Sequence, residues 1–125
     1  MDRQQLILER AHKIIQDKKI PTPYIHKLRW IIQHKKLIYT ANATRTAGDE
    51  NGKQVTAIFY GTSNIATGKI RLTAAIWNRF SGQKLLTRLD YDIVHELRHI
   101  MTRSHKHLPN LTTFDSIIKS WGYSK

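Results

Sequence analysis

Two histidines and a glutamate are spaced so that together they can hold and use a metal ion. His95, Glu96 and His99 form the pattern H-E-x-x-H. On an α-helix, residues four apart lie on one face, so both imidazoles can direct a nitrogen at one point. Zinc accepts such ligands, and a catalytic zinc site combines three protein ligands with one position for water. Glu96 is placed to reach that water as a general base.

A third ligand must come from outside this motif, and two later histidines are candidates. His105 lies six residues after the motif, so the helix must end or bend before it for the ring to return to the same face. His107 can be reached by the same loop. We favour His105 as the third ligand and keep His107 as the alternative. His12, His26 and His34 fall on polar faces of expected helices, where we expect them to be solvated.

These residues predict a hydrolytic centre that cleaves peptide bonds. Zinc lowers the pKa of its bound water to about 7, so hydroxide is available at neutral pH. Glu96 would take the proton from that water as it attacks a carbonyl, and then deliver it to the leaving amine. Asp92 and Asp115 are candidates for carboxylates that orient the histidine rings. We therefore expect a zinc-dependent metallopeptidase acting on a protein or peptide substrate.

The motif lies in a stretch with helical periodicity. Apolar residues recur there at steps of three and four, which predicts an amphipathic helix over residues 83–104. They are Leu85, Leu86, Leu89, Ile93, Leu97, Ile100 and Met101. The motif is therefore expected on a long helix with one buried side.

The N-terminal part is predicted to form two helices and a hairpin. The first helix covers residues 2–18 with Asp2 as its cap, and the second runs from Thr22, its N-cap, to about residue 36. Residues 37–45 and 54–60 are rich in strand-forming types. The polar cluster between them contains an Asn-Gly pair, which predicts an antiparallel hairpin.

The remaining elements complete a small sheet and a closing helix. Residues 61–68 read as a polar loop, and residues 69–73 alternate polar and apolar types as a third strand. That strand could form a sheet edge that pairs with an extended peptide. Residues 74–80 do not distinguish helix from strand. After Thr112, which can act as a cap, the apolar set Phe114, Ile117, Ile118 and Trp121 predicts a last helix ending near Gly122.

Together these elements predict an α+β fold. It comprises two N-terminal helices, a small, mainly antiparallel three-stranded sheet, a long helix carrying H-E-x-x-H, and a short C-terminal helix. A chain of 125 residues fits one domain over residues 1–125, which we expect to be a monomer. The chain has no cysteine, so a metal must be held by histidines and carboxylates. Neither a signal peptide nor an apolar run of membrane-spanning length is visible, so we expect a cytoplasmic protein without a membrane partner.

Charge is the second strong signal of the sequence. Lys and Arg number 21 against 9 Asp and Glu, a formal net charge of +12. Such an excess favours polyanions, of which nucleic acid is the commonest. We therefore expect non-specific DNA binding through the basic surface, with the protein associated with DNA or the nucleoid. The alternative to a peptidase is a non-enzymatic basic nucleic-acid-binding protein with a structural, histidine-bound zinc.

The helix motif also supports a family resemblance. Residues 89–100, with the later His105, resemble the core of YgjP-like metallopeptidase domains, relatives of the SprT-like and Wss-type proteases. Residues 60–63 and 68–73 are similar to the loop and strand that precede the active helix in those domains, and residues 114–122 to their closing helix. The resemblance covers about half of the chain.

The resemblance carries specific expectations. It implies zinc at His95, His99 and His105, a catalytic Glu96, and a gluzincin-like fold in which a small sheet packs on the active-site helix. The SprT-like and Wss-type relatives further imply proteolysis of DNA-associated proteins. The chain departs from the pattern in three places: Pro109 stands where an aromatic residue is usual, the usual loop cysteine is absent, and Arg98 is a charge inside the motif.

Overall fold

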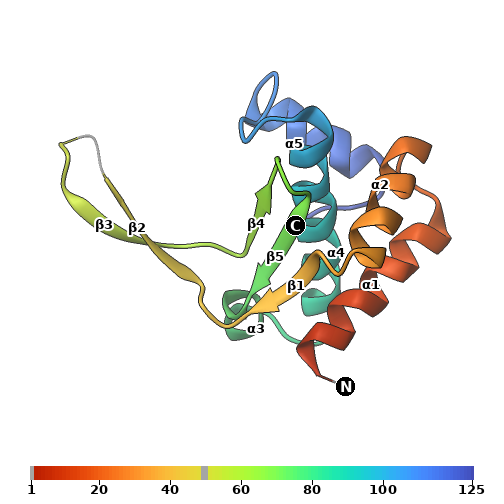
Figure 1. Cartoon of the computed structure of the whole chain (residues 1–125), viewed down its shortest axis with the longest axis horizontal. Coiled ribbons are helices and arrows are strands. Elements are labelled where there is room, and N and C mark those ends of the chain that lie inside the picture. Colours follow the sequence, from red (N-terminus) through yellow and green to blue (C-terminus); the bar gives the residue numbers. More distant parts are fainter. Residues whose placement is uncertain (1, 49–50) are drawn as a thin grey trace.

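The computed structural model describes residues 2–48 and 51–125, which form an α+β fold (Figure 1). The helices in this part of the chain are α1 (Arg3–Asp17), α2 (Thr22–Gln33), α3 (Ala74–Arg79), α4 (Gly82–Thr102) and α5 (Leu111–Ser120). The strands are β1 (Leu37–Thr40), β2 (Thr44–Gly48), β3 (Gln54–Ile58), β4 (Gly61–Asn64) and β5 (Lys69–Thr73). The predicted fold class and the helical position of the motif are confirmed.

The two N-terminal helices form largely as predicted. Asp2 caps α1, and its carboxylate accepts from the Gln5 backbone while the Gln5 side chain accepts from the Asp2 backbone. In α2 the predicted cap is wrong by one residue, because Pro21 is the N-cap and Thr22 is already helical. The extended backbone of Pro21 leaves its carbonyl to accept from the amides of Tyr24 and Ile25, which closes the first turn.

The three-stranded sheet has the order β1-β5-β4. β1 pairs with β5 in parallel, and β4 pairs with β5 antiparallel. The prediction that residues 69–73 form an edge is wrong, since β5 is the central strand. The predicted loop 61–68 contains the edge strand β4, whose polar sequence Gly-Thr-Ser-Asn hides its strand character. Its pairing is favoured by packing against α4 rather than by local propensity.

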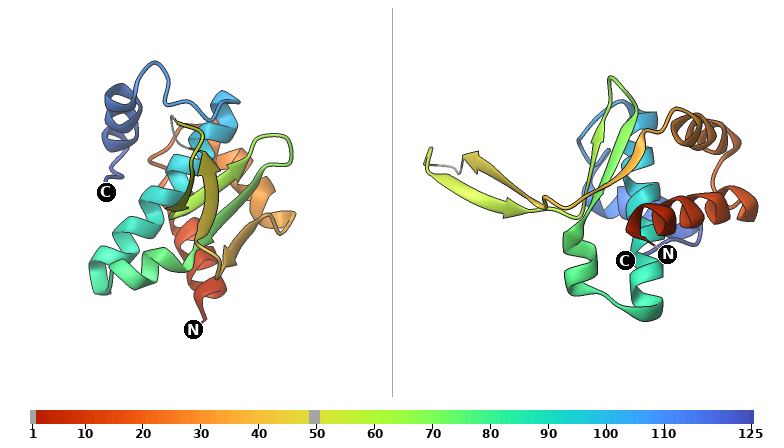
Figure 2. Two further views of the ribbon diagram at one scale, coloured as in Figure 1. Left: turned by 90° about the vertical axis from the view of Figure 1, so that its left-hand side faces the viewer. Right: turned by 60° about the horizontal axis from the view of Figure 1, so that its bottom comes forward.

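The predicted hairpin exists but belongs to a separate sheet. β2 and β3 pair antiparallel from Thr44 opposite Ile58 to Gly48 opposite Gln54. The predicted strand 37–45 is split, because the chain bends after β1 and Asn42 Oδ1 accepts from the Thr44 amide at 3.1 Å. Part of the predicted turn, residues 49–50, lies outside the described residues. The hairpin extends away from the body of the molecule on the side of the sheet opposite the helices (Figures 1 and 2).

Helix α4 lies at the centre of the core. It packs against α1, α2 and α5 and against strands β4 and β5. Its predicted apolar positions Leu89, Ile93, Leu97 and Ile100 are buried, which confirms the periodicity. Residues 74–79, which were ambiguous in the sequence, form α3, capped by the Thr73 hydroxyl.

Helix α5 closes the molecule beside α4 (Figure 1). Its N-cap is Asn110, whose Oδ1 accepts from the Thr113 amide at 2.9 Å, and not the predicted Thr112. Phe114 and Ile118 are buried as predicted, while Trp121 is half-buried. Among the described residues, no helix has the length and apolar character needed to cross a membrane.

Candidate metal centre

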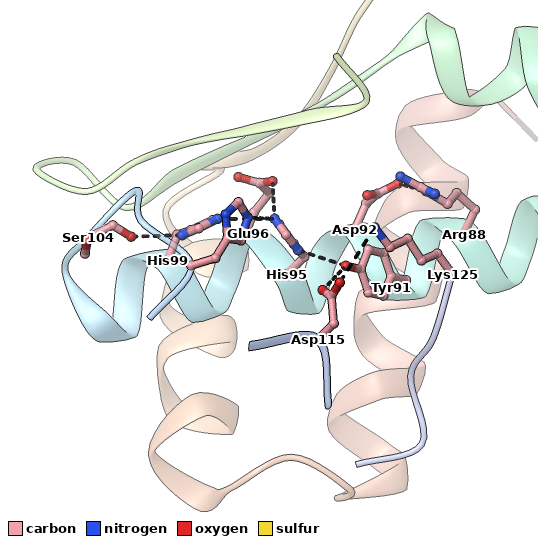
Figure 3. A network of polar contacts seen from close by, with 10 residues as sticks. Arg88, Tyr91, Asp92, His95, Glu96, His99, Ser104, Asp115 and Lys125 are labelled. Atoms are coloured by element: carbon pink, nitrogen blue, oxygen red, sulfur yellow. Dashed lines mark hydrogen bonds and ion pairs between the residues drawn. The ribbon is translucent and has the colours of Figure 1, made fainter. Parts of the chain in front are cut away.

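The H-E-x-x-H motif occupies the C-terminal half of α4 (Figure 3). Glu96 and His99 are buried, and His95 is half-buried. The two histidines lie one turn apart, and their Nε2 atoms are 3.2 Å from each other. A helix anchored in the core thus holds both rings in a fixed relation.

The end of α4 determines where the chain goes next. Arg103 has a left-handed backbone with φ of 55°, and the Ser104 amide donates back to the His99 carbonyl at 3.1 Å. This turn brings the Ser104 carbonyl to within 2.8 Å of His99 Nδ1. His99 therefore donates from Nδ1 and presents the lone pair of Nε2 to the site. The helix ends between His99 and His105, as the sequence predicted.

The third histidine of the cluster is His107. Its Nε2 atom lies 3.3 Å from His95 Nε2. Within the described residues, the ligand atoms of His95, His99 and His107 all lie within 4.8 Å of one another. These three side chains could hold one metal ion, because their imidazole nitrogens converge on a common point.

His105, which we favoured from the sequence, is placed differently. Its side chain is exposed, and its ring centroid is 6.2 Å from that of His99, against 4.9 Å for His107. After the left-handed turn at Arg103, His105 lies outside the histidine cluster, and the chain comes back to the cluster at His107. The structure thus brings together the alternative, His107, with the motif pair. Helical periodicity could not show this, because the choice depends on the conformation of an irregular loop.

Phe114 of α5 forms an aromatic platform under the three histidines. Its ring stacks on His99 with centroids 4.9 Å apart and an interplanar angle of 28°. It also meets the edges of His95 at 5.1 Å and His107 at 4.9 Å. The sequence placed Phe114 in the buried stripe of the last helix but gave no signal of this contact with the site.

A tyrosine and an aspartate orient His95 (Figure 3). The Tyr91 hydroxyl donates to Asp115 Oδ1 at 2.7 Å and lies 3.1 Å from His95 Nδ1. Because the Tyr91 hydroxyl donates its proton to Asp115, its oxygen accepts a hydrogen bond from Nδ1 of His95. Nε2 of His95 is then unprotonated and has a free lone pair. Asp115 thus acts on the ring through Tyr91. The other predicted aspartate, Asp92, instead pairs with Arg88 at 2.9 Å.

Glu96 lies beside the histidine cluster. Its Oε2 is 4.0 Å from His95 Nε2. Burial raises the pKa of Glu96 to about 7, and the neighbouring Ser63 hydroxyl of β4 opposes this by favouring the charged form. Gly61 of β4 also packs closely, since a Cβ atom there would lie 3.3 Å from Glu96 Cγ. Strand β4 thus borders the carboxylate directly.

Burial also keeps the histidines neutral. It lowers the pKa of His95 to about 3, with a further lowering from His99 and His107. The pKa of His99 is lowered by burial as well, against the effect of the Ser104 carbonyl. A metal ion binds the neutral form of imidazole. Because the lowered pKa values keep these rings neutral, protons compete only weakly with a metal for their nitrogens.

Arg98 is not a ligand of the cluster, and its charge is held by neighbouring aromatic residues. Its guanidinium donates to the Tyr24 hydroxyl at 3.1 Å and lies 5.1 Å above the Phe114 ring and 5.8 Å from that of Trp121. It therefore connects α4 to α2 and α5.

Three comparisons with known proteins add no relative. No protein-family model matches the chain, and neither the curated proteins nor the solved structures include a match. The chemistry of the site therefore rests on the residues themselves.

Proposed function

We propose that this protein is a zinc-dependent metallopeptidase with Glu96 as its general base. The observation that carries the proposal is the convergence of three imidazole nitrogens beside a buried carboxylate. The ligands would be His95, His99 and His107.

Two of the three separations between the donor atoms match the spacing that zinc requires, and all three lie within 4.8 Å. A tetrahedral site with Zn–N bonds of about 2.0–2.1 Å separates its ligand atoms by about 3.3 Å. The two Nε2 separations from His95 are 3.2 and 3.3 Å. Two of the three rings are held in the tautomer that presents Nε2, through Tyr91 and Ser104. Bound zinc would supply an acidified water and a Lewis acid for the substrate carbonyl.

Glu96 has the position and the environment of a proton carrier. Its carboxylate lies next to the site and not among the ligand atoms of the cluster. Its pKa of about 7 is near neutral pH, where a group can both accept and return a proton. Glu96 would take a proton during the attack on the carbonyl carbon and pass it to the leaving amine.

The free edge of β4 supplies a place for an extended peptide. β4 pairs with β5 along one edge only, and its other edge is not paired within the described sheet. Gly61 and Ser63 of this strand lie beside Glu96. A peptide added to β4 would therefore run past the carboxylate, held by backbone hydrogen bonds that depend little on its sequence.

The non-enzymatic alternative, a structural zinc, requires a different coordination. Structural zinc sites are closed by four protein ligands. The cluster found among the described residues has three members, and exposed His105 is not one of them. The open position favours the peptidase.

Replacing Glu96 by Gln tests the proposal. Glu96→Gln should keep one zinc per chain but lower the cleavage of a labelled unfolded protein such as casein by at least about 100-fold. Glu9→Gln, an exposed glutamate on α1, is the matched control and should retain wild-type activity. Full activity in Glu96→Gln, or no cleavage by the zinc-loaded wild type, would overturn the proposal.

A further inference from the structure

The outer face of the three-stranded sheet forms an open depression whose lining includes Thr62, Ser63 and Asn64 of β4. Its volume is about 760 Å³. Ile70 and Leu72 of β5 point into the core, so the alternating residues Lys69 and Arg71 point to the opposite side. The base of the β2–β3 hairpin forms the second wall, which stands away from the sheet on the side opposite the helices (Figure 2). We call this depression the basic basin; its polar lining includes Asn42, Thr62, Asn64, Thr67, Lys69 and Arg71.

The two cations of the basin have no partner in the described part of the chain. The ion pairs found there involve Arg10, Lys13, Arg88, His95 and Lys125. Neither the Lys69 ammonium nor the Arg71 guanidinium takes part in an ion pair, a side-chain hydrogen bond or a ring contact there. Among the residues that the structure describes, none with a carboxylate lines the basin. Two adjacent, uncompensated positive charges in a concave site attract an anionic ligand.

The neutral side chains of the basin also present donors. The Asn64 carbonyl oxygen already accepts from the amides of Ala66 and Thr67, which leaves its NH₂ group for a ligand. Asn42 uses its oxygen on Thr44 in the same way. The Thr67 hydroxyl oxygen accepts from the Lys69 amide at 3.3 Å, so its proton is available. Local turns therefore consume the acceptors and leave a surface of donors, as phosphate oxygens require.

We propose that the basic basin binds a nucleic-acid strand through its phosphates. A polymer with a dense, regular charge fits better than an acidic peptide for two reasons. The basin is open to solvent, and Phe59 at the hairpin base offers a ring next to Arg45, whose guanidinium carbon is 5.5 Å from the ring centroid. An aromatic ring and an arginine beside a cationic track are the elements used to hold single strands.

The basin also reaches the metal centre. His105 lines it, and the His105 ring centroid is 6.2 Å from that of His99. A strand bound in the basin would therefore lie close to the metal centre. Binding itself does not depend on peptidase activity.

The test measures binding of a fluorescein-labelled 20-nucleotide DNA, single-stranded and as a duplex, by fluorescence anisotropy without any protein substrate. Lys69→Gln/Arg71→Gln should weaken binding at least tenfold and make the dependence on salt less steep. Arg29→Gln/Lys84→Gln is the matched control: it also removes one Lys and one Arg, both exposed on helices outside the basin, and should change binding less than twofold.

A second variant separates a specific basin from general positive charge. Asn64→Asp keeps the oxygen that accepts from Ala66 and Thr67 but turns a donor into an anion, so it should preserve the fold and weaken binding severalfold. Equal losses in the basin and control pairs, equal competition by poly-glutamate, or no DNA binding by the wild type would overturn the proposal.

Discussion

Single side chains decide whether the histidine cluster is ready to bind a metal. Tyr91 is buried and connects His95 to Asp115 through one hydroxyl. Groups that orient a ligand ring in this way commonly change metal affinity by about 10–100-fold when removed. The orientation of His95 thus depends on a residue one turn before it on the same helix.

Tyr91→Phe should therefore weaken zinc binding by about 10–100-fold without unfolding the protein. Competition with a zinc chelator measures this affinity. Tyr123→Phe is the matched control, because the buried Tyr123 hydroxyl has no hydrogen-bond partner within the described residues. Equal zinc affinities in wild type and Tyr91→Phe would show that the hydroxyl does not position His95.

At this scale the sequence predicted what helical spacing can encode. His95, Glu96 and His99 follow from a four-residue repeat on one helix, and the structure places them side by side. The choice between His105 and His107 depends on the backbone of a short loop. Neither residue type nor periodicity distinguishes two histidines separated by a single lysine.

At the scale of the elements, close packing holds strand β4 against helix α4. At Gly61 a Cβ atom would lie 3.3 Å from Cγ of Glu96 on α4 and 3.1 Å from Cδ2 of Leu72 on the paired strand β5. This contact explains why an intrinsically poor strand former occupies an edge strand beside the carboxylate.

Gly61→Ala should lower the free energy of unfolding by about 1–3 kcal/mol, since an added methyl must displace its neighbours. Because one neighbour is the Glu96 side chain, peptidase activity should fall as well. Gly48→Ala in β2 is the control, since no described residue lies within 4 Å of its added Cβ. Chemical denaturation measures both variants, and an unchanged stability in Gly61→Ala would show that the contact relaxes freely.

Elements with strong periodicity or turn chemistry were predictable, and those shaped by tertiary contacts were not. The apolar repeat of α4 and the Asp2 cap of α1 are visible in the sequence. Strand β4 has no apolar alternation, and the central place of β5 depends on its partners β1 and β4. The sequence could not show that its third strand would be enclosed on both sides.

At the scale of the whole molecule, burial of the histidine cluster makes the folding stability depend on pH. The pKa of His95 is lowered from 6.5 to about 3, mainly by burial. Between those values the unfolded chain binds a proton at this position that the folded chain does not. His95 taken alone therefore lowers the stability of the metal-free protein as the pH decreases through this window.

We expect His95 to contribute a slope of up to about 1.4 kcal/mol per pH unit between pH 6 and pH 4. Denaturation in the presence of a chelator, for wild type and His95→Gln, isolates this contribution. The wild type should lose more stability on acidification than the variant does. Parallel pH profiles would mean that His95 titrates normally in the folded state. Asp92 and Glu96 act in the opposite direction, since burial raises their pKa values to about 6 and about 7, but both residues are present in both proteins.

At the molecular scale, the charge predicted a polyanion as partner but not where it would bind. Net charge is a sum over the sequence, whereas the basic basin exists only because β5 is central and the hairpin stands off its outer face. That arrangement depends on long-range strand pairing, which no local pattern encodes.

The zinc content of the purified protein tests the central claim most directly, measured beside His107→Ala and His105→Ala. One zinc per chain is expected in the wild type and in His105→Ala, and a loss of bound zinc in His107→Ala, with circular dichroism confirming that all three are folded. Zinc retained in His107→Ala but lost in His105→Ala would contradict the site described here. A folded wild type that takes up no zinc would contradict the metal centre altogether.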